Sequence, residues 1–246
     1  MKFGIPIKLH SKSEKVGNIV INIDYDAKVL SLIKHGLQQV NPELFEKLYS
    51  KPTQKLFTTS LYFQNAKFTK DKIILNERGE MKLFFSTDDT YLGLNYYNAF
   101  VKLSHDKNLT FGPNLNADIG KLYIIELKPI ISNNVKFKTM SPLILRDEKG
   151  MFISCDNESK IEAYNIALRR NTLTKLENKP ELQSMVKDLT FIPIKTRKTV
   201  RKSFNTMVEC TVGTFMLKGN PALLTFLENT GLGEKTGTFS GMISPA

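Results

Sequence analysis

The chain has 246 residues, more than the ~100–150 typical of one domain, so two domains are expected. Hydrophobic residues make up 41% of the sequence, which excludes a disordered polyelectrolyte. The 35 Lys and Arg residues outnumber the 24 Asp and Glu residues and give a formal net charge of +11. Such an excess attracts polyanions such as nucleic acid, but it also keeps a surface soluble, so the location of the charges must decide.

The first half of the chain predicts alternating strands and helices. Phe3, Ile5, Ile7 and Leu9 alternate with other residues, which predicts a strand. The later elements are a helix over 25–40 capped by Asp24, a short helix over 42–49, a strand over 55–63, a hairpin of 73–75 and 81–85 around a turn at 76–79, a helix from 88 to about 103 capped by Thr87, and a strand over 122–127. This order is that of a ferredoxin-like domain.

The second half predicts a looser unit of the same kind. Its elements are strands over 135–138 and 143–145, a helix over 158–176, strands over 189–195 and 200–204 around a basic turn, a long strand over 206–217, a helix from 221 to about 228, and a closing strand over 239–243. We therefore expect an α+β protein of two tandem ferredoxin-like domains, over residues 1–128 and 129–246.

The cysteines and the hydropathy of the sequence indicate the cellular compartment in which the protein is expected. Cys155 and Cys210 lie outside any C-x-x-C motif, so neither a zinc site nor a disulfide framework is indicated. The N-terminus starts with a strand pattern instead of a signal peptide, and no apolar stretch approaches the ~20 residues that span a bilayer. The sequence predicts a cytoplasmic protein that has no membrane segment and needs neither a cofactor nor a metal.

Four glycines punctuate the C-terminal segment GLGEKTGTFSG over 231–241. This segment follows a predicted helix and precedes a predicted strand, whereas dinucleotide-binding and Walker loops follow a strand and open a helix, so nucleotide-cofactor binding is disfavoured. Glycine lets backbone amides approach a phosphate closely, and a lysine adds a cation. The predicted phosphate-binding residues are Gly231, Gly233, Lys235, Gly237 and Gly241. Helix capping is the alternative for Gly231 alone.

A second cluster of cations lies in KTRKTVRK over 195–202, which holds five cations and no acid. The pattern places it in the turn of a hairpin. A solvated turn is the plain alternative, but charges at this density favour contacts with phosphates. The predicted nucleic-acid contacts are Lys195, Arg197, Lys198, Arg201 and Lys202.

Three segments together resemble the sixth CRISPR-associated (Cas) family. They are the glycine-rich segment with its Met242-Ile243 closure, Asn41-Pro42 leading to KLFTTSL over 55–61, and FKTMSP over 137–142, which is similar to the family's F-x-T-x-S-P stretch. The resemblance covers nearly the whole chain. It implies two ferredoxin-like domains of the RAMP type and binding of CRISPR repeat RNA. Other Cas proteins of an effector complex and a second copy of the chain are the further partners considered.

The resemblance also implies a reaction. The family cleaves repeat RNA into guide RNAs without a metal, by attack of a 2′-hydroxyl on the adjacent phosphate, which leaves 2′,3′-cyclic phosphate and 5′-hydroxyl ends. This chemistry needs a base for the 2′-hydroxyl and an acid for the leaving oxygen. It also needs a cation or hydrogen-bond donors for the crowded phosphate.

The candidate catalytic residues follow from the resemblance and from helical spacing. Lys55 stands where relatives carry a lysine, and its cation suits the crowded phosphate. Tyr49 occupies the position that holds a histidine in relatives, and the nearest histidine here is His35. On its predicted helix, His35 faces away from the apolar stripe. We therefore expect His35 to be exposed and to act as the general acid or base, with Tyr49 assisting. His10 and His105 are the competing histidines.

Several alternatives remain at this stage. Two aspartate pairs, at 24 and 26 and at 88 and 89, could hold metals, although capping and dipole effects at helix starts account for both. A non-catalytic RNA-binding subunit of a CRISPR complex is the second functional hypothesis. A ferredoxin-like RNA-binding protein of the translation apparatus is the third, and the glycine-rich segment argues against it.

Overall fold

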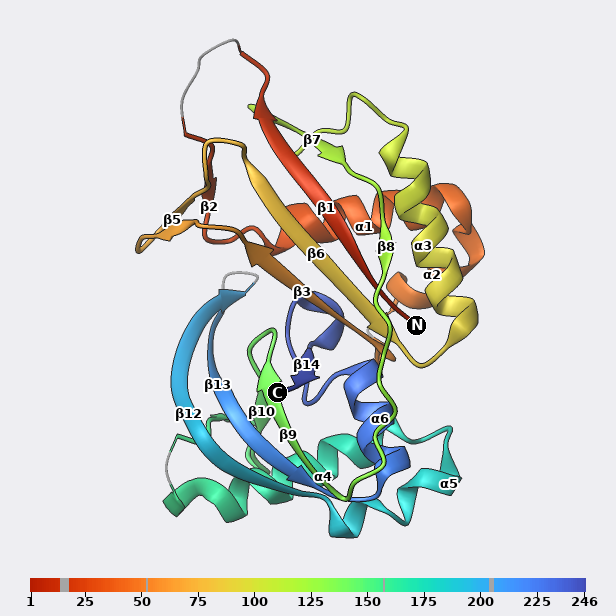
Figure 1. Ribbon diagram of the computed structural model, residues 1–246, viewed down its shortest axis with the longest axis vertical. Helices are drawn as coiled ribbons and strands as arrows, with labels where there is room; N and C mark the ends of the chain where they lie inside the picture. The colour runs from red at the N-terminus through yellow and green to blue at the C-terminus, as the bar shows by residue number, and fades with distance from the viewer. Residues whose placement is uncertain (14–17, 52, 157, 204–205) are drawn as a thin grey trace.

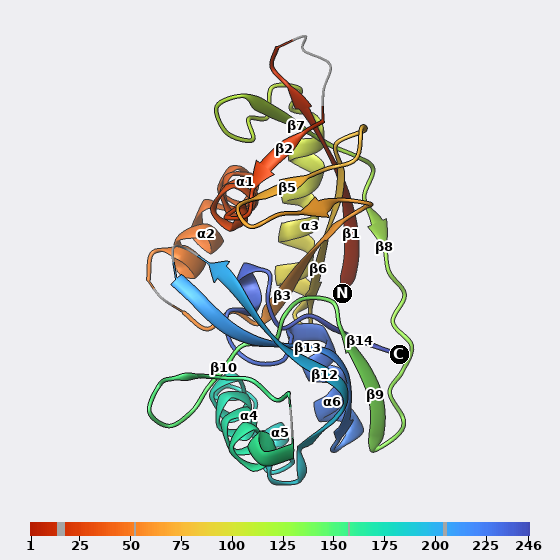
Figure 2. The ribbon, with the colours of Figure 1, turned by 90° about the vertical axis from the view of Figure 1, so that its left-hand side faces the viewer.

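The computed structural model describes residues 1–13, 18–51, 53–156, 158–203 and 206–246. The chain forms two lobes along the long axis, each with a sheet and its own helices (Figure 1). The segment after β8 (Tyr123–Ile124) runs as an extended strap down one side of the molecule to β9 (Asn134–Thr139) in the other lobe (Figure 2). The expected domain boundary between 128 and 129 falls within this strap and stays a prediction.

The N-terminal lobe is built on an antiparallel sheet with the order β3-β6-β1-β7, and β8 also pairs with β1. Phe3 and Ile5 of β1 are fully buried in one core with Leu37 and Phe100 from the covering helices. The strand order confirms a ferredoxin-like domain. Its remaining elements are β1 (Lys2–Ser11), β3 (Phe57–Phe63), β6 (Glu80–Thr87), β7 (Leu115–Ile119), α1 (Asp26–Val40), α2 (Pro42–Tyr49) and α3 (Thr90–Ser104).

The C-terminal lobe repeats the arrangement with the sheet order β12-β13-β9-β14. The chain order β9-α4-β12-β13-α6-β14 gives the same topology as in the first lobe, which confirms two tandem ferredoxin-like units. The elements are α4 (Ile161–Lys175), β12 (Thr190–Ser203), β13 (Thr206–Lys218), α6 (Pro221–Thr230) and β14 (Ile243–Pro245), with the minor elements β10 (Leu145–Arg146), β11 (Phe152–Ile153), η1 (Glu158–Lys160), α5 (Pro180–Gln183), η2 (Val186–Asp188) and η3 (Thr236–Thr238).

The hairpin expected from residues 73–75 and 81–85 is wrong. β5 (Lys72–Ile74) joins β2 (Val20–Asn22) and β4 (Lys67–Phe68) in a separate three-stranded sheet, whereas β6 pairs with β1 and β3. The turn itself forms, since the amide of Gly79 donates to the carbonyl of Asn76 at 2.9 Å. The turn was therefore predicted correctly, but the strands before and after it pair with other strands and not with each other.

Both predicted N-caps are also wrong. α1 follows Tyr25 without any side-chain cap from Asp24, and α3 is capped by Asp89 instead of Thr87. The carboxylate of Asp89 accepts from the amide of Leu92 at 3.0 Å. The strand expected over 122–127 is reduced to β8, and β7 before it was not predicted.

The basic segment over 195–202 lies within a strand and not in a turn. β12 stays paired with β13 through this segment up to Ser203 opposite Thr206, with a bulge between Pro193 and Lys195. Phe204, the expected end of the second strand, lies outside the described residues. Because side chains alternate along a strand, the cations are divided between the two faces of the hairpin.

The glycine-rich segment is held between the two lobes. Its Phe239 is 1% exposed and belongs to the core of the N-terminal lobe, whereas its Leu232 belongs to the core of the C-terminal lobe. The amide of Phe239 donates to the hydroxyl of Thr59 on β3 at 3.1 Å. A Cβ at Gly233, where φ is +86°, would collide with the carbonyl oxygen of Ile144. Glycine is therefore needed here for the close approach of the segment to Ile144 in the C-terminal lobe.

An ion pair ties the β12–β13 hairpin to the N-terminal lobe. One terminal nitrogen (Nη2) of Arg201 lies 2.6 Å from each carboxylate oxygen of Asp26, and the hydroxyl of Ser203 donates to this carboxylate at 3.0 Å. The Asp26 side chain is fully buried and that of Arg201 is 13% exposed. Burial raises the pKa of Asp26, with a smaller contribution from the negative charge of Asp24, against the lowering effects of Arg201 and Ser203. Asp26 thus has an inter-lobe contact instead of the capping role expected for it.

We expect Asp26→Ala to lower the free energy of unfolding by roughly 3 kcal/mol, because it leaves the Arg201 guanidinium largely buried and unpaired. Denaturant unfolding of the two proteins measures the difference. Asp71→Ala, at an exposed aspartate, is the control and should stay within about 0.5 kcal/mol of the wild type. An equally small change in Asp26→Ala would show that the pair does not hold the hairpin.

Two further sequence expectations concern cysteines and membranes. Cys155 and Cys210 are free and buried, and burial raises the pKa of each thiol to about 11. Within the ranges that the structure describes, no helix is both long and apolar enough for a bilayer crossing.

Candidate functional site

A cavity of about 490 Å³ lies where the end of α2 meets the glycine-rich segment. The lining brings together four residues that the sequence predicted, Tyr49, Lys55, Lys235 and Gly237, from opposite ends of the chain. We call this cavity the Lys55 pocket. Among the residues that the structure describes, its lining is Tyr49, Thr53, Gln54, Lys55, Lys235, Thr236, Gly237 and Thr238.

Lys55 lies between α2 and β3 and is held by local contacts. Its Nζ donates to the carbonyl of Leu48, near the end of α2, and to the hydroxyl of Thr53 at 2.6 Å. Burial lowers the pKa of Lys55, and the positive charge of Lys34 lowers it further. The amine is thus a cation that gives up its proton more readily than an ordinary lysine.

Tyr49 presents its ring, and not its hydroxyl, to these lysines. The Nζ atoms of Lys34 and Lys55 lie 4.7 Å and 5.0 Å from the ring centroid. The hydroxyl of Tyr49 lies 2.8 Å from that of the fully buried Tyr96, and burial raises the pKa of Tyr49 to about 12. An aromatic face attracts cations, so the ring positions both lysines, while the hydroxyl is poorly placed to transfer a proton.

His35 is exposed on α1, as expected, but it does not line the Lys55 pocket. Its Nε2 lies 2.9 Å from Nε2 of Gln39. It lines a neighbouring cavity of about 460 Å³ together with Lys34. Because Lys34 also contacts the ring of Tyr49, this side chain links the two cavities.

Only part of the glycine-rich segment faces the Lys55 pocket, namely the stretch from Lys235 to Thr238. Several of the other amides are used within the protein: the amide of Gly231 donates to the carbonyl of Leu227 at 2.8 Å, and that of Gly241 donates to Pro142 at 2.9 Å. Gly231 thus also caps α6, the alternative considered for it. Lys235 and Gly237 are the predicted phosphate contacts that the geometry places in the pocket.

A buried lysine donates a hydrogen bond to the backbone of the glycine-rich segment. Nζ of Lys175 on α4 donates to the carbonyl of Gly231 at 2.5 Å, and its side chain is almost fully buried. Burial lowers the pKa of Lys175 to about 7, against the smaller raising effect of Glu234. Glu234 is in turn paired with Arg146 at 3.2 Å.

The five cations of the basic segment have different environments. Arg201 is paired with Asp26, and Lys198 is paired with Glu209 of the neighbouring strand. Lys195, Arg197 and Lys202 are exposed, and within the described ranges none of the three has an ion pair. These three are therefore free to contact a polyanion.

Three of the four aspartates considered as metal ligands have other contacts. Asp26 holds Arg201, Asp89 caps α3, and Asp88 is paired with Lys179 at 3.1 Å. The part of the chain that the structure describes holds no group of three or more His, Cys, Asp or Glu side chains placed to bind a metal.

Sequence reasoning missed Lys34 and the threonines that flank the predicted residues. Lys34 precedes His35, and Thr53 and Thr238 lie beside Lys55 and Gly237 in the folded chain. Their proximity to predicted residues was the only sequence signal. The cation of Lys34 depends on α1 packing beside α2, which no local pattern encodes.

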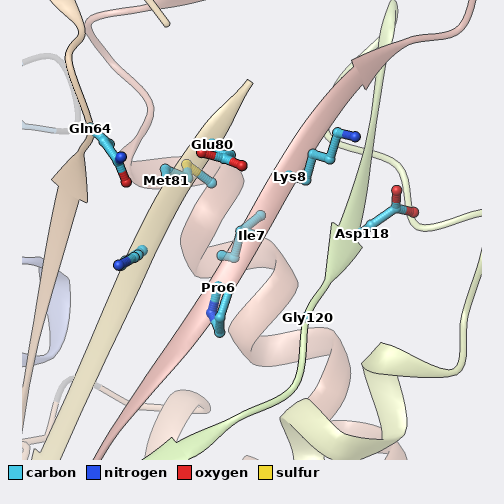
Figure 3. Close-up of a pocket in the computed structure, with 9 residues that line it drawn as sticks. Pro6, Ile7, Lys8, Gln64, Glu80, Met81, Asp118 and Gly120 are labelled. Atoms are coloured by element: carbon cyan, nitrogen blue, oxygen red, sulfur yellow. The ribbon is translucent and has the colours of Figure 1, made fainter. Parts of the chain in front are cut away.

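Another cavity, of about 440 Å³, lies on the outer face of the N-terminal sheet (Figure 3). Lys8 and Lys82 lie among its lining residues with Glu80 and Asp118, so the charges balance. No residue of the predicted site lines it. Its charge gives no preference for an anionic ligand, and we assign it no role.

Two family models match the two lobes. "CRISPR-associated protein Cas6, N-terminal" matches residues 20–103, and "CRISPR associated protein Cas6, C-terminal" matches residues 125–245. The chain belongs to the Cas6 family. The second match contains the glycine-rich segment and β14, and the first contains α1, α2 and Lys55. Both sides of the Lys55 pocket thus come from Cas6 domains.

Solved structures share this Cas6 fold at low sequence identity. A structure described as an RAMP protein binding different RNA substrates is 20% identical, with a TM-score of 0.77 and 99% of each chain covered. A Cas6-related protein from Pyrococcus furiosus is 18% identical, with a TM-score of 0.77, over 100% of this chain and 99% of that one. A Thermus thermophilus Cas6 product complex is 15% identical, with a TM-score of 0.70 and both chains fully covered. None of the curated proteins matches the sequence.

Proposed function

We propose that this protein binds CRISPR repeat RNA and cleaves it at the Lys55 pocket to release guide RNAs. Membership in the Cas6 family supports CRISPR repeat RNA processing in general, and the net charge of +11 suits an RNA partner. The observation that carries the cleavage proposal is the meeting of Lys55 and Lys235 in one cavity. Two cations placed together can hold the charge that develops on a phosphate under attack.

The proposed reaction is a transesterification within the RNA. The 2′-oxygen bonds to the adjacent phosphorus while the bond from phosphorus to the 5′-oxygen breaks, which leaves a 2′,3′-cyclic phosphate and a 5′-hydroxyl. A base takes the proton of the 2′-hydroxyl, and an acid gives one to the 5′-oxygen. Each role falls to a side chain, so the proposed cleavage is metal-independent.

The roles follow the geometry. Lys55 stabilises the phosphate, and Lys235 with the adjoining Gly237 positions it. Tyr49 assists by holding Lys34 and Lys55 against its ring. His35 acts as acid or base from the neighbouring cavity, with the RNA lying across both cavities.

A non-catalytic RNA-binding subunit of an effector complex is the second candidate. It is favoured by the inward hydroxyl of Tyr49 and by the position of His35 outside the Lys55 pocket. Incubating the purified protein with repeat RNA in excess chelator distinguishes the two. We expect cleavage to fragments with cyclic phosphate ends, and no cleavage of RNA with a 2′-deoxy nucleotide at the cleaved position. Binding without cleavage would favour the subunit, and cleavage that stops in chelator would refute metal independence.

A further inference from the structure

A groove with a cavity volume of about 980 Å³ separates the small sheet of β2, β4 and β5 from the outer half of the β12–β13 hairpin. None of the described residues lines both this groove and the Lys55 pocket. Arg201, which lines the groove, is paired with Asp26 of the N-terminal lobe, so the ion pair holds the hairpin beside this lobe. The volume of the groove is at the upper end of the range usual for ligand sites, ~300–1,000 Å³.

Three apolar side chains from both lobes face this groove with much of their surface exposed. They are Phe68 on β4, Val200 on β12 and Met207 on β13, with exposed fractions of 58%, 49% and 64%. The ring of Phe68 packs edge-on against that of Phe63, with the ring centroids 5.8 Å apart and an angle of 81° between the ring planes. This contact fixes the orientation of the Phe68 ring. An exposed, oriented ring in a groove is a platform on which a base can stack.

Cations line the same groove. Lys70, Arg197 and Lys202 contribute to the lining, and no ion pair involves any of them in the parts of the chain that the structure describes. Cations beside aromatic and apolar surface are the combination with which proteins hold single-stranded nucleic acid. Bases in a duplex stack on one another and cannot reach such a ring, so the groove suits unpaired nucleotides.

Asp24 gives the groove an acceptor. It lines the groove, and its Oδ1 is buried without a hydrogen-bond partner among the described residues. An unpaired buried acceptor is costly unless a ligand supplies a donor. Among bases, cytosine presents an amino group that a carboxylate accepts well, whereas uracil presents a carbonyl oxygen at the equivalent position.

We propose that this groove binds an unpaired stretch of the RNA substrate, with a base stacked on Phe68, phosphates held by Arg197 and Lys202, and an amino group donated to Asp24. This rests on the proposed function, because the RNA that enters the groove is the one cleaved at the Lys55 pocket. The basic hairpin then works as one wall of a preformed site and not as a free arm.

Fluorescence anisotropy at fixed salt, with a short single-stranded RNA, tests the stacking. Phe68→Ala should weaken binding about 5- to 150-fold, the range expected for the loss of one base–aromatic stack. Phe68→Tyr should keep the affinity, and Tyr62→Ala, at an aromatic residue that is 51% exposed and lies outside the groove, is the matched control. Unchanged affinity in Phe68→Ala, or an equal loss in Tyr62→Ala, would overturn the proposal.

The proposed function is read out separately, as cleavage of saturating repeat RNA. If the wild type cleaves while Phe68→Ala binds single strands normally, the groove proposal alone fails. If the wild type neither binds nor cleaves repeat RNA, both fail. Cleavage by Phe68→Ala at the wild-type rate under saturation, with weakened single-strand binding, supports both.

Base preference tests the role of Asp24. The wild type should bind oligocytidylate more tightly than oligouridylate, and Asp24→Ala should bring the two affinities together. Asp71→Ala is the matched control, since Asp71 also lines the groove. Equal affinities in the wild type, or a preference that survives Asp24→Ala, would remove the carboxylate from the proposal.

Discussion

Lys55→Ala should slow single-turnover cleavage of repeat RNA by about 10²–10³-fold while changing its affinity little. The loss is that of one preorganised charge from a developing phosphate transition state. The proposed RNA-binding surface includes the groove and the basic hairpin, so we expect one lysine to contribute little to affinity. Lys47→Ala, at an exposed lysine in the last turn of α2, is the control and should cleave normally.

The dependence of the cleavage rate on pH should also show the titration of Lys55. Burial and the charge of Lys34 lower its pKa from 10.5, and the cation is the active form, so the rate should fall as the pH rises, before an ordinary lysine would lose its proton. Lys34→Ala removes one of these two causes and should move the alkaline limb to higher pH. Lys55→Arg keeps the charge to higher pH and should abolish that limb. A limb in the same place in all three proteins would exclude Lys55 as its origin.

The parts of the fold that sequence predicted best are those set by local periodicity. The alternation of Phe3, Ile5, Ile7 and Leu9 fixes which face of β1 is buried, and Asn41-Pro42 fixes the start of α2. The family resemblance then singled out Lys55, whose role stays a prediction. The periodic features need only neighbouring residues, and they led to the correct fold class, although β7 was missed and the basic segment was expected to be a turn.

What sequence missed depends on contacts between distant residues. Asp26 meets Arg201 across 175 positions, so a segment expected to be a free basic turn is a clamped strand. Tyr49 points its hydroxyl at Tyr96, which no helical pattern reveals. The glycines were interpreted as a phosphate cradle, yet Gly233 is required by the carbonyl of Ile144. Local patterns proposed residues for the site, but tertiary packing decides which partners these residues have.

His35→Ala should slow single-turnover cleavage by about 10²–10⁴-fold, the usual contribution of a general acid or base. Imidazole is a common general acid or base, and the exposure of His35 beside Lys34 leaves it open to RNA. His10→Ala and His105→Ala are the matched controls, since His10 on β1 lies beside Asp118 of β7 and His105 follows the last residue of α3. Both should cleave at the wild-type rate.

Affinity separates this role from RNA positioning. Binding of RNA with a 2′-deoxy nucleotide at the cleaved position measures affinity without chemistry, and His35→Ala should bind it as the wild type does. Gln39→Ala removes the contact at 2.9 Å between Nε2 of Gln39 and Nε2 of His35 but keeps the imidazole. It should therefore lower the cleavage rate far less than His35→Ala does. A wild-type rate in His35→Ala would show that proton transfer does not pass through α1. The acid–base role would then move into the Lys55 pocket, where the lowered pKa of Lys55 makes its amine the next group to test.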